Sequence, residues 1–183
     1  VGDELVIRGL DFSLPQADSK IIEIIEKMGG KLKVDTGKGE VKVYGSESLF
    51  GGDFDLSDTP DLLPVVAVLA LRSNSPVRIY GISHTRLKET DRIANITSQF
   101  IKLGVRIKEQ NKDEICIIPP KVLKNASLEA FNDHRLFMAF TIASMLTQKS
   151  IVAGAESVDV SYPNFLQDMK RIGARISSMP ERE

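Results

Sequence analysis

The chain has 183 residues, of which 42% are hydrophobic and 27% charged, a balance typical of a folded globular protein rather than a disordered one. Its 24 Lys and Arg residues nearly cancel its 25 Asp and Glu residues, so the net charge of −1 gives no reason to expect nucleic acid or an anionic membrane as a partner. The single Cys116 excludes an internal disulfide and a multi-cysteine metal site, and no apolar run approaches the ~20 residues of a membrane span.

Three segments of the chain repeat one pattern, in which a short β-like run closed by glycine precedes an amphipathic helix. The runs are LVIRG (5–9), VRIYG (77–81) and SIVAG (150–154), and the helices are expected at 19–30, 89–105 and 162–174. Each helix closes with a basic residue, an apolar residue and a glycine, as helix C-termini often do. These glycines, Gly29, Gly104 and Gly173, recur at similar intervals along the chain. The spacing predicts an internal repeat.

Two further helices are expected to be buried, because DLLPVVAVLAL (61–71) and DHRLFMAFTIASML (133–146) are apolar nearly all round. They begin with Asp61 and Asp133. The number of residues between these two positions is close to the number between successive glycines of the repeat. Two short strands are predicted before each of these helices. They lie at 31–34 and 40–45 before the first helix and at 105–109 and 114–120 before the second. Cys116 lies in the last of these and is interpreted as a strand or core residue.

The repeating unit is therefore predicted to be a strand, an amphipathic helix, two strands and a buried helix. Residues 1–183 are expected to form one α/β (α+β) domain of such units. The third unit stops after its first helix and a possible strand at 174–177. Because a repeat array that lacks part of one unit has an open flank, residues outside this sequence are expected to complete it.

The stretch HTRLKETDRI (84–93) places cations where a helix is expected to begin. Lys88 and Arg92 are four positions apart, so they would share one face of the first turn. Cations at a helix N-terminus oppose the helix macrodipole, which favours negative charge there. One interpretation is a solvated helix end joined by salt bridges of little energetic consequence.

The start of the second buried helix favours another interpretation. In FNDHRLFM (131–138), Asn132 or Asp133 is a plausible N-cap, and Arg135 begins an otherwise apolar helix, where an unpaired charge would be costly. Two helix N-termini that each offer an arginine suit an anion such as phosphate or carboxylate. The carboxylates Asp61 and Glu89 beside them suit acid–base chemistry. The simpler alternatives are that Asp61 only begins a helix and that Glu89 only pairs with a nearby arginine.

LKETDR (87–92), NDHR (132–135), DLLPVVA (61–67) and YPNF (162–165) together resemble the C-terminal half of 5-enolpyruvylshikimate-3-phosphate (EPSP) synthase, the 3-phosphoshikimate 1-carboxyvinyltransferase family. The resemblance implies a pseudo-three-fold domain, one of two, with an N-terminal segment of the same chain closing one of them. It implies enolpyruvyl transfer from phosphoenolpyruvate to the 5-hydroxyl of shikimate 3-phosphate by addition and elimination. This cytoplasmic reaction of the shikimate pathway, which leads to the aromatic amino acids, uses no metal or organic cofactor.

The resemblance also implies roles for individual residues. By position in the motifs, Asp61 matches the proton acceptor and Glu89 the second acid–base carboxylate. Lys88 matches a contact to shikimate 3-phosphate, and Arg92 and Arg135 match contacts to phosphoenolpyruvate. Asp133 and His134 are expected to support Arg135, with His134 in an orienting or structural role rather than a catalytic one. His84 occupies the position where many relatives have an asparagine that contacts shikimate 3-phosphate.

Two departures from the family pattern stand out. Val160 occupies a position where many relatives have a lysine that contacts phosphoenolpyruvate. The family's other domain and its N-terminal Lys and Arg are absent from this sequence, so the chain alone is expected to fold but to be inactive. The alternative function is an RNA-binding or RNA-processing module built from similar α/β repeats. Near-zero net charge and 6% aromatic residues argue against it.

Overall fold

The structure, a computed structural model, describes residues 4–178. Its strands are β1 Glu4–Arg8, β2 Lys31–Asp35, β3 Glu40–Tyr44, β4 Gly52–Asp55, β5 Val77–Tyr80, β6 Arg106–Gln110, β7 Glu114–Ile118, β8 Ser127–Glu129 and β9 Ile151–Ala153. Its α-helices are α1 Lys20–Lys27, α2 Leu63–Ala70, α3 Arg92–Lys102, α4 His134–Ser144 and α5 Phe165–Arg171. Short 3-10 helices lie at Ala17–Ser19, Pro60–Leu62, Ser83–Leu87 and Ala155–Val160. None of the described helices has the length and hydrophobicity needed to cross a membrane.

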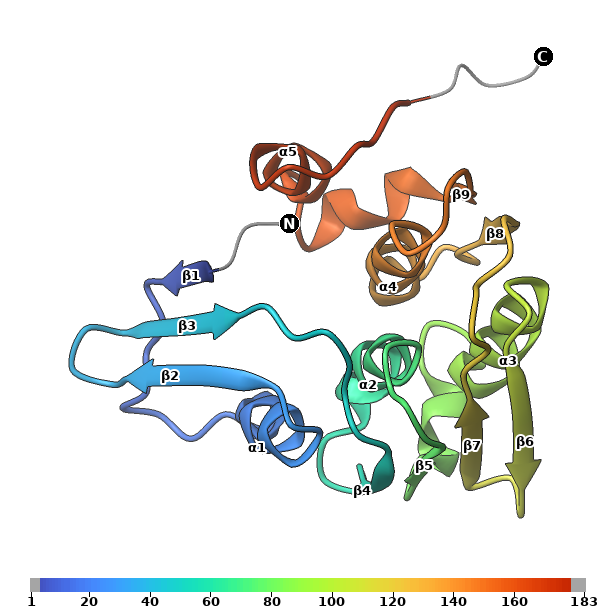
Figure 1. Cartoon of the computed structure of the whole chain (residues 1–183), viewed down its shortest axis with the longest axis horizontal. Helices are drawn as coiled ribbons and strands as arrows, with labels where there is room; N and C mark the ends of the chain where they lie inside the picture. The colour runs from blue at the N-terminus through green and yellow to red at the C-terminus, as the bar shows by residue number, and fades with distance from the viewer. Residues whose placement is uncertain (1–3, 179–183) are drawn as a thin grey trace.

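The strands form three sheets around the central helices α2 and α4, and α1 and α5 also lie at the periphery (Figure 1). The first sheet is antiparallel with the order β1-β3-β2, and the second is mixed with the order β4-β5-β7-β6. The third contains only β8 and β9 among the described residues. β4 runs parallel to β5 and β8 runs parallel to β9, so the last strand of one unit pairs with the first strand of the next. This pairing joins successive units.

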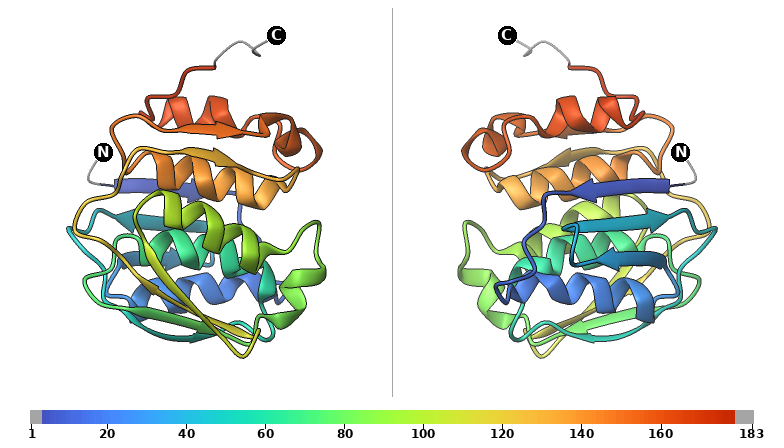
Figure 2. Two further views of the ribbon diagram at one scale, coloured as in Figure 1. Left: turned by 90° about the vertical axis from the view of Figure 1, so that its right-hand side faces the viewer. Right: turned by 90° about the vertical axis from the view of Figure 1, so that its left-hand side faces the viewer.

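Helices α2 and α4 pack against each other at the centre of the molecule (Figures 1 and 2). Leu63, Val66 and Ala67 of α2 are buried, as are Leu136 and Phe140 of α4. They belong to one hydrophobic core that also takes in residues of α1, α3 and the second sheet. The predicted buried helices are therefore confirmed in position, although each begins one or two residues later than expected.

The predicted repeat is confirmed. Its clearest sign is the shared backbone conformation of the glycines that follow the helices. Gly29, Gly104 and Gly173 follow α1, α3 and α5 with φ of 78°, 85° and 99°, a left-handed conformation that glycine adopts without a steric penalty. The unit contains one strand more than predicted, because β4 and β8 precede the central helices. These strands have four and three residues, too few for an alternating pattern to reveal them, and they lack the closing glycine that revealed the equally short β5 and β9. The prediction for Cys116 is confirmed, since it lies half-buried in β7.

Two local predictions are wrong. Residues 174–178 have no regular secondary structure, so the possible strand at 174–177 is not formed. The helix expected from about residue 89 begins at Arg92, because Asp91 caps it by accepting a hydrogen bond from the backbone N–H of Ala94 at 2.9 Å. Lys88 therefore lies in a loop before α3 and not in its first turn.

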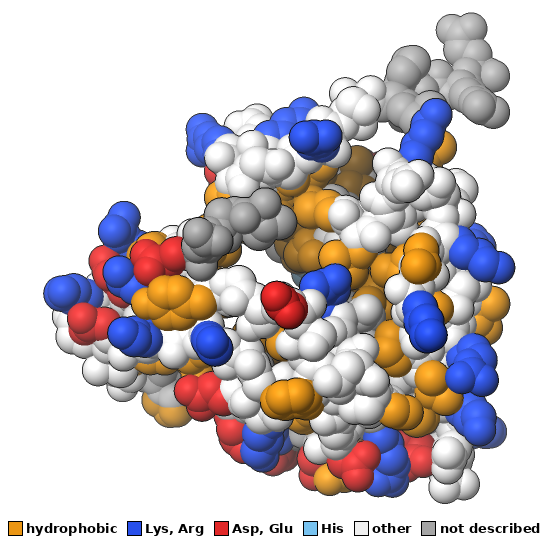
Figure 3. Space-filling model, in the orientation of Figure 1, with side chains coloured by type: hydrophobic (Ala, Val, Ile, Leu, Met, Phe, Trp, Pro, Cys, Tyr) orange, Lys and Arg blue, Asp and Glu red, His pale blue; other side chains and the backbone are white. Residues whose placement is uncertain are grey.

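The flank beside β1 exposes apolar side chains. Leu5 and Ile7 lie opposite Val43 and Val41 on one face of the first sheet, yet they are 42% and 43% exposed. On α4, Ile142 is 40% exposed. Figure 3 shows this face of the molecule hollowed between the first sheet and the layer of α4 and α5, with hydrophobic side chains along the hollow. Within the described residues, apolar side chains of β1 and α4 thus remain partly exposed on this flank.

Candidate active site

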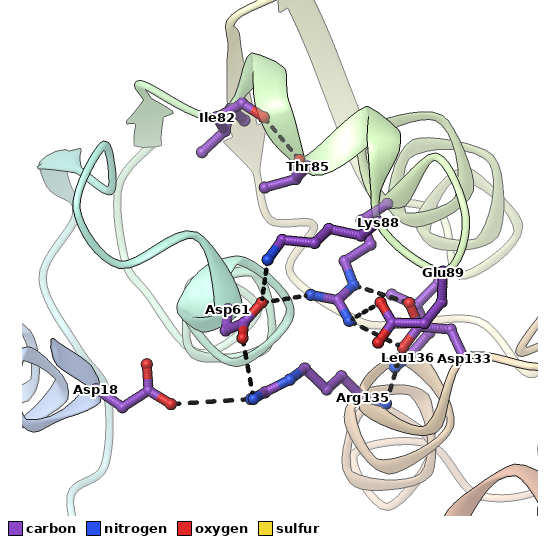
Figure 4. A network of polar contacts seen from close by, with 10 residues as sticks. Asp18, Asp61, Ile82, Thr85, Lys88, Glu89, Asp133, Arg135 and Leu136 are labelled. Carbon is purple, nitrogen blue, oxygen red and sulfur yellow. Dashed lines mark hydrogen bonds and ion pairs between the residues drawn. The ribbon is translucent and has the colours of Figure 1, made fainter. Parts of the chain in front are cut away.

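Six of the eight predicted site residues meet where the starts of the two central helices face the loop before α3 (Figure 4). Asp61 lies in the 3-10 helix that leads into α2, and the loop supplies Lys88 and Glu89. The others are Arg92, at the start of α3, and Asp133 and Arg135, at the start of α4. Segments that are far apart in the sequence are thus joined in one cluster.

Asp133 is fully buried, and its two carboxylate oxygens bind different groups. Its Oδ1 atom accepts hydrogen bonds from the backbone N–H groups of Arg135 and Leu136 at 2.9 and 3.2 Å, which makes it the N-cap of α4. Its Oδ2 atom accepts from Nε of Arg92 at 2.8 Å. An N-cap at Asn132 or Asp133 was predicted, and the structure selects Asp133.

The guanidinium of Arg92 is enclosed by three carboxylates. Besides the contact to Asp133, Nη1 donates to Asp61 Oδ1 at 2.8 Å and Nη2 donates to Glu89 Oε2 at 2.7 Å. The Arg92 side chain is only 1% exposed. Burial on its own would lower the pKa of Arg92, but hydrogen bonds and charges from Asp133 and the other carboxylates outweigh it and raise that pKa. Arg92 is therefore fully paired in this structure.

Asp61 lies among three cations. Lys88 Nζ is 3.4 Å and Arg92 Nη1 is 2.8 Å from its Oδ1 atom, and Arg135 Nη2 is 3.1 Å from its Oδ2 atom. Partial burial acts to raise the pKa of Asp61, but the charge of Arg135, the hydrogen bond from Arg92 and the charge of Lys88 together hold it below the ordinary value of 3.8. Asp61 is therefore ionised near neutral pH.

Asp18 is a carboxylate at this site that the sequence did not reveal. It belongs to the 3-10 helix before α1, and its Oδ2 atom lies 3.9 Å from Nη1 of Arg135 (Figure 4). In the sequence Asp18 is one more acidic residue before a helix, a common position with no specific signal. Asp18 and Asp61 thus bring the first unit to the cluster, and the second unit supplies its other residues.

The two histidines remain outside the cluster. His84 is exposed in the 3-10 helix Ser83–Leu87, and His134 is the half-buried first residue of α4. Within the described part of the chain, no hydrogen bond joins either imidazole to the other site residues. Over residues 4–178 no group of three or more His, Cys, Asp or Glu side chains is arranged to hold a metal ion.

The arrangement offers an anion two cations that still reach solvent, since the side chains of Lys88 and Arg135 are about one third exposed, at 35% and 32%. Of the three carboxylates around Arg92, Glu89 is the most exposed, at 45%, against 31% for Asp61 and 0% for Asp133. Cations that face a ligand next to ionised carboxylates are the groups needed to bind an anionic substrate and transfer its protons.

Solved structures of known proteins contain this fold. The chain superposes on EPSP synthase from Acinetobacter baumannii with a TM-score of 0.82 at 23% identity, covering 95% of this chain and 42% of that protein. It superposes on the enolpyruvyl transferase NikO from Streptomyces tendae with a TM-score of 0.76 at 17% identity, covering 97% of this chain and 41% of that protein. The fold is therefore that of the enolpyruvyl transferases, with one cluster of cations and carboxylates where the helix starts meet.

The model of the EPSP synthase (3-phosphoshikimate 1-carboxyvinyltransferase) family matches residues 1–169, and the chain belongs to that family. It is 48% identical over 175 residues to the 3-phosphoshikimate 1-carboxyvinyltransferase of Nitrosopumilus maritimus, covering 96% of this chain and 41% of that protein. It is 39% identical over 177 residues to the protein of that name from Methanococcus maripaludis, again with 96% and 41% coverage. The chain thus spans about 41% of the length of these curated relatives. All of these proteins are named as enzymes, so the RNA-binding alternative gains no support.

Proposed function

We propose that this chain forms most of the C-terminal domain of a two-domain EPSP synthase and carries half of its active site. The proposed reaction joins the 5-hydroxyl oxygen of shikimate 3-phosphate to C2 of phosphoenolpyruvate, while the methylene carbon gains a proton. Phosphate then leaves the tetrahedral intermediate and a proton is lost from the new methyl group, which restores the double bond. No metal or organic cofactor takes part. The proposed location is the cytoplasm, whose reducing conditions suit the single thiol of Cys116.

The position of Asp61 between Lys88, Arg92 and Arg135 is the observation that carries this proposal. In the absence of substrate these cations hold Asp61 in its ionised form. Once the carboxylate and phosphate groups of the substrates attract Lys88 and Arg135, Asp61 loses part of that stabilisation and becomes a stronger base. Asp61 would then accept the proton of the 5-hydroxyl group at the moment both substrates are bound.

Glu89 is proposed to exchange partners when phosphoenolpyruvate binds. Its carboxylate neutralises Arg92 through a 2.7 Å contact, and it is the most solvent-accessible partner of that guanidinium. An incoming anion would replace Glu89 on Arg92, and the released carboxyl group would then serve proton transfer at the methylene carbon. Asp133 keeps Arg92 in place during this exchange, because it is buried and also caps α4.

Residues outside this sequence are proposed to complete the third unit and to supply the other substrate-binding domain. β1 has a free edge in the first sheet, and β9 has one in the third, within residues 4–178. The exposed Leu5, Ile7 and Ile142 side chains beside these strands suit cover by further strands and a helix. The 183-residue chain by itself is then expected to lack turnover.

The test is phosphate release from phosphoenolpyruvate by the complete protein, with and without shikimate 3-phosphate. Release that requires shikimate 3-phosphate is expected. Asp61→Asn and Arg135→Ala are each expected to lower kcat/KM by at least about tenfold, since a charge-assisted hydrogen bond contributes ~1.5–3 kcal/mol. Arg171→Gln is the control, because Arg171 is 74% exposed and pairs with Asp168 of the same helix, away from the site. Absence of release from a folded complete protein would refute the proposed reaction, and unchanged rates in both site variants would refute the assigned residues.

A further inference from the structure

The loop that carries Lys88 and Glu89 has no regular secondary structure. It lies between the 3-10 helix Ser83–Leu87 and α3, which begins at Arg92. Side chains on a loop are held less accurately than those on helices or strands unless neighbouring groups fix the loop. The proposed chemistry needs both side chains in one geometry, because a displacement of ~1 Å at a reacting group can cost about a hundredfold in rate. The loop therefore needs support from outside the site.

Arg86 provides such support by connecting the two ends of the loop with a neighbouring hairpin. Its Nη1 atom donates to both carboxylate oxygens of Asp91, at 2.9 and 3.2 Å. Its Nη2 atom pairs with Glu109, near the end of β6, and its Nε atom donates to the carbonyl oxygen of Lys112 at 3.2 Å. The guanidinium thus binds the residue before α3 on one side and the β6–β7 hairpin on the other.

The turn of this hairpin holds the start of the same segment. Asp113 accepts a hydrogen bond from the backbone N–H of Ser83 at 2.6 Å, and its carbonyl oxygen accepts one from Ile82 at 3.3 Å. Asn111 and Lys112 adopt φ of 50° and 58°, the left-handed conformation that tight turns between antiparallel strands commonly require. The turn and Arg86 together anchor the segment at both ends.

We propose that Arg86 is a positioning residue for Lys88 and Glu89, with the β6–β7 turn as its rigid support. Arg86 makes its contacts to Asp91, Glu109 and Lys112, so it acts on the reaction only through the loop. This inference rests on the proposed function for the reaction that it affects, but the loop geometry on which it depends is independent of that reaction.

The contacts require the planar fork of an arginine. Three nitrogen atoms of one guanidinium bind three groups in different directions, which a single ammonium group cannot reproduce. Arg86→Lys is therefore expected to restore only part of what Arg86→Gln loses. This graded response separates positioning by a fork from a simple requirement for positive charge near the site.

The experiment compares steady-state kinetics of the complete protein with those of Arg86→Gln and Arg86→Lys. Arg86→Gln is expected to lower kcat by about ten- to a hundredfold and to raise KM for shikimate 3-phosphate, because Glu89 and Lys88 are displaced. KM for phosphoenolpyruvate is expected to rise less than KM for shikimate 3-phosphate, since Arg86 binds neither Asp133, which holds Arg92, nor α4, which carries Arg135. In a Glu89→Gln background, the additional effect of Arg86→Gln on kcat is expected to be smaller than in the wild type, because only the displacement of Lys88 then remains to lower kcat.

Arg78→Gln is the matched control. Arg78 of β5 pairs with Glu114 of β7, so its loss also removes an arginine–carboxylate pair from the second sheet, but one that does not hold the loop. Equal losses of kcat in Arg78→Gln and Arg86→Gln would overturn the proposal, as would a full effect of Arg86→Gln in the Glu89→Gln background.

A further measurement, amide hydrogen exchange of residues 87–92, does not depend on turnover. Arg86→Gln is expected to accelerate it at least about tenfold while α4 is unaffected, since the loop loses its anchors.

Unchanged exchange in the loop would overturn the proposal even in an active enzyme. Conversely, a complete protein without turnover would refute the proposed function, and the exchange measurement would still decide whether Arg86 holds the loop. The two failures are therefore distinguishable.

Discussion

Asp133 holds Arg92 with one carboxylate oxygen and caps the helix that carries Arg135 with the other. Two arginines of the candidate site, on different helices, thus depend on one buried side chain. Because Asp133 is completely buried and Arg92 is 1% exposed, neither charge can be solvated if the other is removed. This pair fixes the relative position of α3 and α4 at the site.

Replacement of the buried partner should therefore destabilise the fold strongly. Asp133→Asn keeps the size of the side chain and its capacity to cap a helix, but it leaves the Arg92 charge without its buried counter-ion. We expect a loss of about 3–5 kcal/mol in the free energy of unfolding, measured by urea denaturation. Glu89→Gln is the comparison, because it removes a partly exposed carboxylate from the same guanidinium and should cost less than about 1 kcal/mol. Similar losses in both variants would contradict the importance that we assign to burial.

Acid sensitivity should depend on Asp61. Its pKa is lowered in the folded state, so its contribution to stability is present above the ordinary value of 3.8 and is lost as the pH falls through the lower folded value. The free energy of unfolding of the wild-type chain should decrease as the pH is lowered below about 4, and Asp61→Asn should reduce that slope. Asp58→Asn, which removes an exposed carboxylate from the turn just before Asp61, serves as the control. An Asp61→Asn variant with the wild-type slope would show that other groups dominate the acid response.

Val160 offers a gain-of-function test of the family resemblance. It is 83% exposed at the end of the 3-10 helix Ala155–Val160, so a lysine can replace it without loss of packing. If the family resemblance implies correctly that a lysine at this position contacts phosphoenolpyruvate, Val160→Lys in the complete protein should lower KM for phosphoenolpyruvate several-fold at low salt. The effect should weaken as ionic strength screens the added charge. An unchanged KM at all salt concentrations would mean that this position does not face the substrate.

The open flank can be tested through Leu5 and Ile7. If residues outside this sequence cover β1, the double change Leu5→Thr and Ile7→Thr should destabilise the complete protein by at least about 2 kcal/mol, since two buried apolar side chains become smaller and more polar. In the isolated 183-residue chain, where these side chains are 42% and 43% exposed, the same change should alter stability much less. Denaturation of both forms measures the difference, and equal effects would argue against a covered flank.

Much of the fold could be predicted from the sequence. The repeat, the five helices and seven of the nine described strands followed from hydrophobic periodicity and from glycine at the helix ends. β4 and β8 were missed because they are short and lack the closing glycine that marked β5 and β9. Their stability comes from pairing with β5 and β9, which lie beyond an intervening helix in the sequence. The start of α3 was misplaced because the cap at Asp91 was not recognised.

At the candidate site, the sequence by itself determined which residues are present: Asp61, Lys88, Glu89, Arg92, Asp133 and Arg135 lie in motifs that resemble those of EPSP synthase. Only the tertiary structure decided how they are paired. It placed Arg92 inside a ring of carboxylates, brought Asp18 from the first unit toward Arg135 and left His84 outside. The physical reason is that charge pairing and burial depend on distances between segments far apart in the chain, and local sequence patterns carry no information about those distances.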